Sequence, residues 1–176
     1  MKNSNIYRAG AAVKQAGFTM VELIVVMVIL GVLAATALPK FISVNDDAAI
    51  AAHAATGGAF ASAVSLAHAQ WIMNGHTAAD DNLAGFGNGD IDTNATGWPV
   101  ATDNNNTNPN NTRCLQIWNG LMQNPPTATT TNSASSGDYY VWSSNSGWCY
   151  YRPFSNTGMR IDYYVVDGRV LVDDTP

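Results

Sequence analysis

The longest apolar stretch of the chain covers residues 18–44, directly after a short N-terminal segment, residues 1–17. Between Phe18 and Pro39 the only charged residue is Glu22, which is also the only glutamate of the protein. About twenty apolar residues in a helix are enough to cross a bilayer. The pattern therefore predicts a membrane-spanning helix that carries one acid near its start.

A second helical pattern begins at Asn45. Apolar and small side chains recur there at steps of three and four residues, which is the spacing of one face of a helix. The members of this stripe are Ile50, Ala54, Gly57, Ala61, Val64, Ala67 or His68, and Trp71. Asn74-Gly75 then supplies residues that favour a left-handed helix cap. We expect an amphipathic helix whose apolar face is covered by a sheet formed further along the chain.

The remaining sequence predicts loops and strands. Residues 75–111 are rich in glycine, asparagine, aspartate and threonine and predict a long surface loop, whereas residues 114–122 fit either a short helix or a strand. Strands are expected at 139–142, 148–152, 159–166 and 169–172, and Asp167-Gly168 predicts a tight turn with positive φ at both positions. The expected fold class is α+β, with the long N-terminal helix packed on an antiparallel sheet of roughly four strands.

The acid in the apolar stretch needs a partner. An ionised carboxylate in hydrocarbon is costly, and acids at membrane depth usually mark a function. A cut between Gly17 and Phe18 would create an amine four residues before Glu22, about one helical turn away. The leader carries three cations and no acid, Lys2, Arg8 and Lys14, which indicates a cytoplasmic location. The alternative is an ordinary signal anchor in which Glu22 reaches toward the interface.

Residues 16–26, with the sequence AGFTMVELIVV, resemble the prepilin cleavage and methylation motif of type IV pilins and type II secretion pseudopilins. The resemblance implies that a prepilin peptidase cuts after Gly17 and N-methylates Phe18, and that Glu22 pairs with the amine of a neighbouring subunit. Gly31 and Pro39 fall where pilins have a flexible helix position and a kink, although both residues also ease packing in a membrane. The implied domains are a leader, 1–17, a transmembrane and assembly helix, 18–44, and a globular head, 45–176.

Shorter stretches of the head are similar to pilins of the mannose-sensitive haemagglutinin (MSHA) type, in particular to an MshB-like minor pilin. These stretches include residues 97–100, GWPV, and residues 114–121, CLQIWNGL. The resemblance implies a subunit that is held in the inner membrane and then polymerises with itself and other pilins into a helical surface fibre for attachment. An inner-membrane assembly platform with an ATPase would drive this step. The alternative is a pseudopilin of a periplasmic type II secretion fibre.

The two cysteines, Cys114 and Cys149, lie in the head, on the periplasmic or extracellular side where disulfides persist. We expect them to pair. The rival interpretation is two thiols that bind a metal, but no histidine or cysteine cluster with ligand spacing accompanies them. Resemblance favours a surface pilus here, because major pseudopilins usually lack the disulfide and carry a calcium site. Asp173-Asp174 is a possible calcium ligand pair, but a solvated acidic terminus explains it more simply.

Composition argues against several other functions. Removing the three leader cations takes Lys plus Arg from 8 to 5 against 13 acids, a net charge near −8, so no nucleic-acid partner is expected. The sequence contains no catalytic motif, and neither an enzyme activity, a cofactor nor a metal site is predicted. His53, His68 and His76 lie on or just after the amphipathic stretch and are expected to be packing or surface residues.

Overall fold

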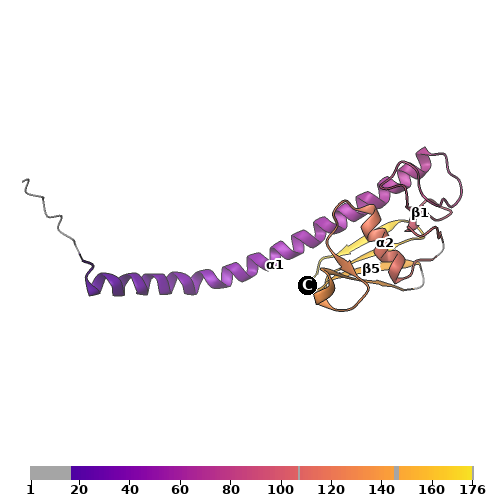
Figure 1. Ribbon diagram of the computed structural model, residues 1–176. Helices are drawn as coiled ribbons and strands as arrows, with labels where there is room; N and C mark the ends of the chain where they lie inside the picture. Colours follow the sequence, from indigo (N-terminus) through magenta and orange to yellow (C-terminus); the bar gives the residue numbers. More distant parts are fainter. Residues whose placement is uncertain (1–16, 107, 145–146, 176) are drawn as a thin grey trace, which may run out of the picture. The chain divides into compact units, whose positions relative to one another are not determined.

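The computed structural model describes residues 17–106, 108–144 and 147–175, and the chain divides into two compact units, Met1–Val44 and Asn45–Pro176. Helix α1, Met20–Met73, supplies helical residues to both units (Figure 1). Residues 1–16 of the expected leader, 1–17, lie outside the described residues. Each unit is described below by itself.

The first unit exposes an apolar helix. Residues Met20–Leu38 are long and apolar enough to span a membrane, and none of them is buried. The stretch Val44–Met73 meets the same length and composition test, but 22% of its 18-residue apolar segment is buried, because it is the core helix of the second unit. Helix α1 runs through Gly31 and Pro39 without interruption. The flexibility expected at these two residues therefore stays a prediction.

In the second unit, one line of side chains on α1 is buried at steps of four and three residues. Its members are His53, Gly57, Phe60, Val64 and Ala67. The predicted stripe contains three of these residues, Gly57, Val64 and Ala67. It does not contain His53, which is polar, or Phe60, whose neighbour Ala61 also fits the helical spacing. The helix ends at Met73, and Gly75 has a φ of 75°, which confirms the predicted left-handed cap.

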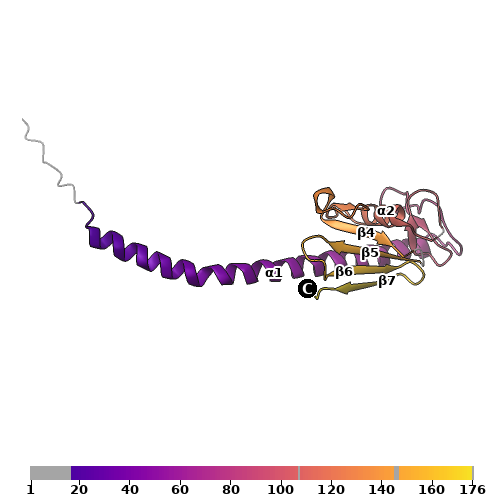
Figure 2. The ribbon, with the colours of Figure 1, turned by 90° about the horizontal axis from the view of Figure 1, so that it is seen from below.

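The main sheet has five strands in the order β3-β4-β5-β6-β7. Figure 2 shows β4 to β7 side by side. The bounds are Ala128–Thr129, Tyr139–Ser143, Trp148–Pro153, Arg160–Tyr164 and Arg169–Asp173. Strands β4 to β7 are antiparallel neighbours, as predicted, whereas the two-residue β3 pairs with β4 in parallel. A strand of two residues leaves no periodic signal in a sequence. A 3-10 turn, Ala134–Ser136, lies between β3 and β4.

The core of the head forms around Phe60. Its ring centroid lies 5.2 Å from that of Tyr151 on β5 and 5.6 Å from that of Tyr163 on β6, both in edge-to-face contact. Trp118 packs on the same ring at 5.6 Å. All four side chains are fully buried, and burial of a side chain of this size contributes about 1.5 to 3 kcal/mol. This aromatic cluster joins helix α1 to the sheet.

The segment 114–122, left open between helix and strand, belongs to helix α2, Asn111–Leu121. The side chain of Asn110 caps it by accepting a hydrogen bond from the N–H of Arg113. Cys114 of α2 is joined to Cys149 of β5 in a disulfide, the pairing expected from the sequence, and both residues are fully buried. With a sequence separation of 35 residues, the crosslink is worth about 3 to 4 kcal/mol on the chain-entropy account.

The prediction of a long surface loop over residues 75–111 was wrong in part. The segment contains a two-stranded sheet, β1, Asp92–Thr93, and β2, Pro99–Ala101. Its few large apolar side chains, Leu83, Ile91 and Val100, are fully buried. The polar composition predicts a loop, but polar side chains here stabilise folded structure. The buried carboxylate of Asp92 accepts hydrogen bonds from the backbone N–H groups of Asn82 and Asn105.

The turn between β6 and β7 also differs from the prediction. It contains four residues, 165–168, and only Gly168 has a positive φ, 71°. Val165 leaves the hairpin because both of its backbone groups are bonded elsewhere: its N–H donates to the Gly147 carbonyl at 2.9 Å, and its carbonyl accepts from Asn94 Nδ2 at 2.7 Å. Contacts with distant segments therefore override the local preference of Asp-Gly.

Candidate functional site

The junction between Gly17 and Phe18 lies in front of the first helix. Residues 17–19 are not helical, and α1 begins at Met20. Phe18 is 90% exposed, and a Cβ added at Gly17 would meet no heavy atom of the described residues within 4 Å. A peptide bond in an exposed, non-helical segment can enter a protease active site without local unfolding. The geometry is therefore compatible with cleavage at this bond.

Glu22 and Thr19 form a reciprocal capping box at the start of α1. Glu22 Oε2 accepts hydrogen bonds from the backbone N–H and the hydroxyl of Thr19, both at 3.1 Å. In return, Thr19 Oγ1 accepts from the N–H of Glu22 at 3.2 Å. Two N–H groups that the helix leaves without partners are thereby satisfied. The negative charge also lies at the favourable end of the helix dipole.

The capping role of Glu22 was not predicted from the sequence. The signal was present, because Thr19-Met20-Val21-Glu22 matches the pattern of a capping box. Both hydrogen bonds from Thr19 reach Oε2, and among the described residues no hydrogen bond reaches the second oxygen, Oε1. Glu22 can therefore hold its own helix start with one oxygen and offer the other to a cation. The predicted partner, the amine of another subunit, stays a prediction.

The surroundings of Glu22 are apolar. A hollow of about 330 Å³ is lined by Phe18, Glu22, Leu23 and Val26. Leu23 and Val26 are more than half exposed, as are nearly all large side chains up to Leu38. A continuous apolar surface of this extent marks a membrane or an assembly contact in natural proteins. Glu22 is the only charged residue between Phe18 and Pro39 and can therefore orient such a contact.

Gly31 and Pro39 lie further along the same helix. A Cβ added at Gly31 would meet nothing within 4 Å among the described atoms, so packing inside this unit does not require a glycine there. Between these two residues, the Thr36 hydroxyl donates to the Leu33 carbonyl at 3.0 Å, a bond that often accompanies local bending of helices. Proline cannot donate to the preceding turn. These features favour a locally weak helix near Pro39.

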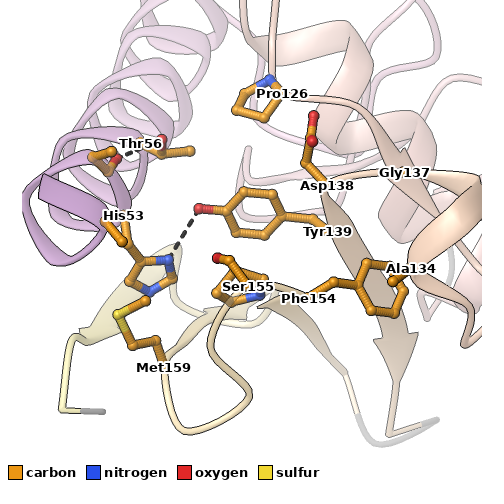
Figure 3. A pocket seen from close by; sticks show the side chains of 13 residues that line it. His53, Thr56, Pro126, Ala134, Gly137, Asp138, Tyr139, Phe154, Ser155 and Met159 are labelled. Carbon is orange, nitrogen blue, oxygen red and sulfur yellow. Dashed lines mark hydrogen bonds between the residues drawn. The ribbon is translucent and has the colours of Figure 1, made fainter. Parts of the chain in front are cut away.

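The head contains a cavity of about 320 Å³ between α1 and the start of β4 (Figure 3). Its lining includes the buried His53, whose Nδ1 lies 3.0 Å from the Tyr139 hydroxyl. Burial raises the pKa of Tyr139 above its usual value. Asp138 at the rim accepts hydrogen bonds from the backbone N–H and hydroxyl of Thr127. The His53–Tyr139 contact therefore joins the helix to the sheet, and the Asp138 bonds join the residues directly before β3 and β4. Among the described residues, this cavity shows no arrangement of nucleophile and base.

The other predicted polar residues also have structural partners. His68 stacks on Trp98 with ring centroids 3.8 Å apart, and its Nδ1 lies 3.1 Å from the Gly97 carbonyl oxygen. His76 Nε2 lies 3.2 Å from Asp80 Oδ2. In the described part of the chain, no three histidine, cysteine or acidic side chains are grouped so that they could hold a metal ion.

Asp173, considered above as a calcium ligand, is engaged inside the chain. Its carboxylate accepts from the hydroxyl and N–H of Thr175, and the hydroxyl bond is the main reason why the pKa of Asp173 is lowered. Arg160 Nε lies 3.9 Å from the same carboxylate. These contacts account for Asp173 without an ion.

Comparison with known proteins gives two matches, both partial. The prokaryotic N-terminal methylation motif matches residues 13–38. The protein "Type IV narrow pilus major component PilA5" of Thermus thermophilus is 44% identical over 54 residues, which are 31% of this chain and 47% of that protein. The chain thus spans about half the length of the curated relative that it matches. No solved structure matches the chain.

The two matches and the fold agree. The methylation motif covers the exposed junction at Gly17, the capping box and the apolar helix described above. The head adds an antiparallel-rich sheet packed on the second part of the same helix, the α+β arrangement expected of a type IV pilin. In its N-terminal motif, in 54 residues of sequence and in its fold, the chain is similar to members of the type IV pilin superfamily.

Proposed function

We propose that this chain is a structural subunit of an MSHA-like type IV pilus that serves surface attachment. A prepilin peptidase removes residues 1–17, N-methylates Phe18, and leaves residues 18–44 as the transmembrane and assembly helix of a head formed by 45–176. The observation that carries the proposal is the unburied apolar helix Met20–Leu38 with a single acid at its start. Such a helix fits anchoring in the inner membrane first and packing among like helices later.

Glu22 is the residue we assign to assembly. One carboxylate oxygen is used by Thr19, and the second oxygen can accept the amine created at Phe18 of a neighbouring subunit. A buried charge pair of this kind costs little only when both partners are present, so it specifies register along the fibre. Gly31 and Pro39 give the helix places to adapt when it moves from lipid to fibre. An inner-membrane platform with an ATPase would supply the energy for this transfer.

The alternative is a pseudopilin of a type II secretion system. The buried disulfide between Cys114 and Cys149 supports the surface pilus, because the family resemblance implies that major pseudopilins usually lack this bond. Both alternatives share the processing step and the role of Glu22. They differ in where the processed chain accumulates.

The test is intact mass and N-terminal sequencing of protein sheared from cells, beside protein retained in membranes. We expect a chain that begins at N-methylated Phe18, is two mass units lighter than the reduced form, and is abundant in the sheared fraction. Gly17→Ser should leave a band heavier by the leader. The processed chain found only in membranes would favour the pseudopilin or a minor subunit, and an uncut leader in the native protein would overturn the proposal.

A further inference from the structure

The solvent face of the main sheet carries a group of aromatic side chains that the fold does not need for its core. Alternation along the strands buries one set of residues against α1 and α2 and leaves the other set outside. Four rings of the outer set gather on neighbouring strands: Trp142, Trp148, Tyr150 and Tyr164. Trp142 is 41% exposed, which is unusual for the largest apolar side chain. We call these four residues the aromatic face.

Three of these rings hold one another in fixed orientations. The ring centroids of Trp142, Trp148 and Tyr150 are 6.0 to 6.4 Å apart, and the three interplanar angles lie between 81° and 88°. Three mutually perpendicular rings cannot all stand edge-on to solvent, so at least one must turn its flat side substantially outward. Tyr164 extends the group, nearly parallel to Trp148 at 6.1 Å. The result is a rigid apolar surface with an accessible ring face.

Most arginines of the head lie around the aromatic face. Residues 45–176 contain four arginines and no lysine, and three of these arginines border the aromatic face: Arg152, Arg160 and Arg169. The guanidinium of Arg169 lies over the Tyr164 ring at 4.3 Å, and that of Arg152 lies 5.3 Å from the Tyr140 ring centroid. Nearby aspartates, Asp162, Asp167 and Asp173, pair with two of these arginines. The face is therefore polar at its edges but close to neutral.

Two buried polar atoms on this side of the sheet lack hydrogen-bond partners. Asp162 is 6% exposed, and its Oδ2 lies 3.2 Å from Arg160 Nε, but no described group bonds Oδ1. Arg152 donates from Nη2 to Asn132, while its buried Nε has no partner in the described chain. Asp162 is the cross-strand neighbour of Tyr150. An unused acceptor and an unused donor thus adjoin the rings, and such groups normally find partners.

We propose that the aromatic face is a binding site for a neutral saccharide. A pyranose ring has an apolar side whose C–H groups suit the negative face of an aromatic ring, and hydroxyls that can both donate to Asp162 and accept from Arg152. Leu171 and Arg160, the neighbours of Asp162, are about half exposed, so their side chains have room to turn aside for a hydroxyl. The proposal is independent of the fibre proposed above, because every residue involved lies in one head.

A purely structural role and a nucleic-acid ligand both fit the aromatic face less well. Cross-strand aromatic pairs stabilise a sheet by about 0.2 to 1 kcal/mol each, but that role needs neither the exposure of Trp142 nor the unpartnered polar atoms. Single-stranded nucleic acid also stacks on aromatic rings, but it requires a positively charged groove. Twelve aspartates against four arginines in residues 45–176 make the head strongly acidic. A neutral ligand fits this balance better than a polyanion.

The test uses the full chain in lauryldimethylamine oxide, a detergent without a sugar headgroup, because an alkyl glycoside would compete for the site. Binding is measured on a printed array of neutral, acidic and amino glycans, with a thymidine oligonucleotide as a second probe. We expect dose-dependent binding to neutral glycans. Trp142→Ala should weaken it about tenfold, as expected for the loss of a stacking ring, and Asp162→Asn should weaken it several-fold. Leu66→Ala, which removes an exposed apolar side chain on α1, is the matched control and should bind normally.

The disulfide, read from intact mass, and the near-UV circular dichroism of each variant establish that the head is folded. A folded Trp142→Ala that binds glycans as well as the native chain would overturn the proposal. So would the absence of glycan binding by the native chain, or binding of the oligonucleotide in its place. Because processing and fibre formation do not enter this experiment, its failure leaves the proposed pilin function untouched.

Discussion

The two parts of helix α1 follow opposite rules. From Met20 to Leu38 the large side chains are exposed in every direction around the helix. Beyond Asn45 the same helix buries a single line of residues and leaves the others half-buried or exposed. A helix that is apolar all round needs lipid or other helices, whereas a helix with one apolar face needs only a sheet. The first part is therefore suited to contacts outside its own unit, and the second to a fixed core.

The largest expected effect separates charge from capping in the first part. Glu22→Gln keeps the capping box, because glutamine can also accept from Thr19, but it removes the charge. We expect fibre incorporation to collapse, since loss of one partner of a buried pair costs about 3 to 5 kcal/mol at each contact. The head should be unaffected. The measurement is the ratio of sheared to membrane-bound protein by immunoblot.

Thr19→Ala is the matched control, because it removes the cap and keeps the charge. This variant should still enter fibres, with a helix start weakened by about 1 kcal/mol. Normal assembly of Glu22→Gln would refute the ion pair between subunits. Equal failure of both variants would mean that the helix start, and not the charge, limits assembly.

A second pair of variants compares the two faces of α1 in the head. Phe60→Ala should lower the free energy of unfolding by about 3 to 5 kcal/mol, because it leaves a cavity between Trp118, Tyr151 and Tyr163. Leu66→Ala, at a side chain that is 62% exposed, should change it by less than about 0.5 kcal/mol. Urea unfolding followed by near-UV circular dichroism measures both. Similar losses in the two variants would contradict the burial described for α1.

Two adjacent glycines, Gly57 and Gly58, allow the same comparison of the buried and exposed faces of α1, with smaller expected changes in stability. A Cβ at Gly57 would overlap Val172 Cγ2, so Gly57→Ala should destabilise the head by about 1 to 3 kcal/mol. A Cβ at Gly58 meets nothing within 4 Å in the described structure, so Gly58→Ala should stabilise by about 0.5 to 1 kcal/mol through helix propensity. Thermal midpoints of the two variants should shift in opposite directions. A shift of the same sign would mean that β7 does not approach α1 at Gly57.

The smallest effect concerns the pH dependence of the sheet. Burial raises the pKa of Asp162, which Arg160 opposes only in part. The native state then holds this proton more tightly than the unfolded state, so stability falls as the pH rises from the unfolded pKa to the native pKa. Asp162→Asn removes this loss. We expect its thermal midpoint, relative to the native chain, to rise between about pH 3 and about pH 6. A difference independent of pH would contradict the raised pKa.

Much of the fold could be predicted because its signals are local. Strands β4 and β5 show alternating burial, and the cap at Gly75 needs only one residue with positive φ. The turn at 165–168 could not be predicted, because bonds from Asn94 and Gly147 decide it from far along the chain. The order of residues 75–110 was hidden for the same reason. Its polar side chains bond to the backbone inside the fold instead of to water.

The candidate site divides in the same way. Gly17, Phe18 and Glu22 stand out in the sequence because a charge interrupts an apolar stretch. The capping role of Glu22 could also have been predicted, because its spacing from Thr19 is that of a capping box. The aromatic face could not be predicted from the sequence. Its four rings come from three strands, and only the register of the sheet brings them together.

The capping box at Thr19 also limits the freedom of the chain end. With the leader removed after Gly17, Phe18 would be the only residue in front of the N-cap. Fixing the backbone of one residue costs about 1 to 2 kcal/mol in conformational entropy. The amine at Phe18 would therefore reach a neighbouring carboxylate after the ordering of a single residue, whereas a longer free end would multiply that cost. On this account, the position of the cut keeps the loss of conformational entropy small when a subunit joins a fibre.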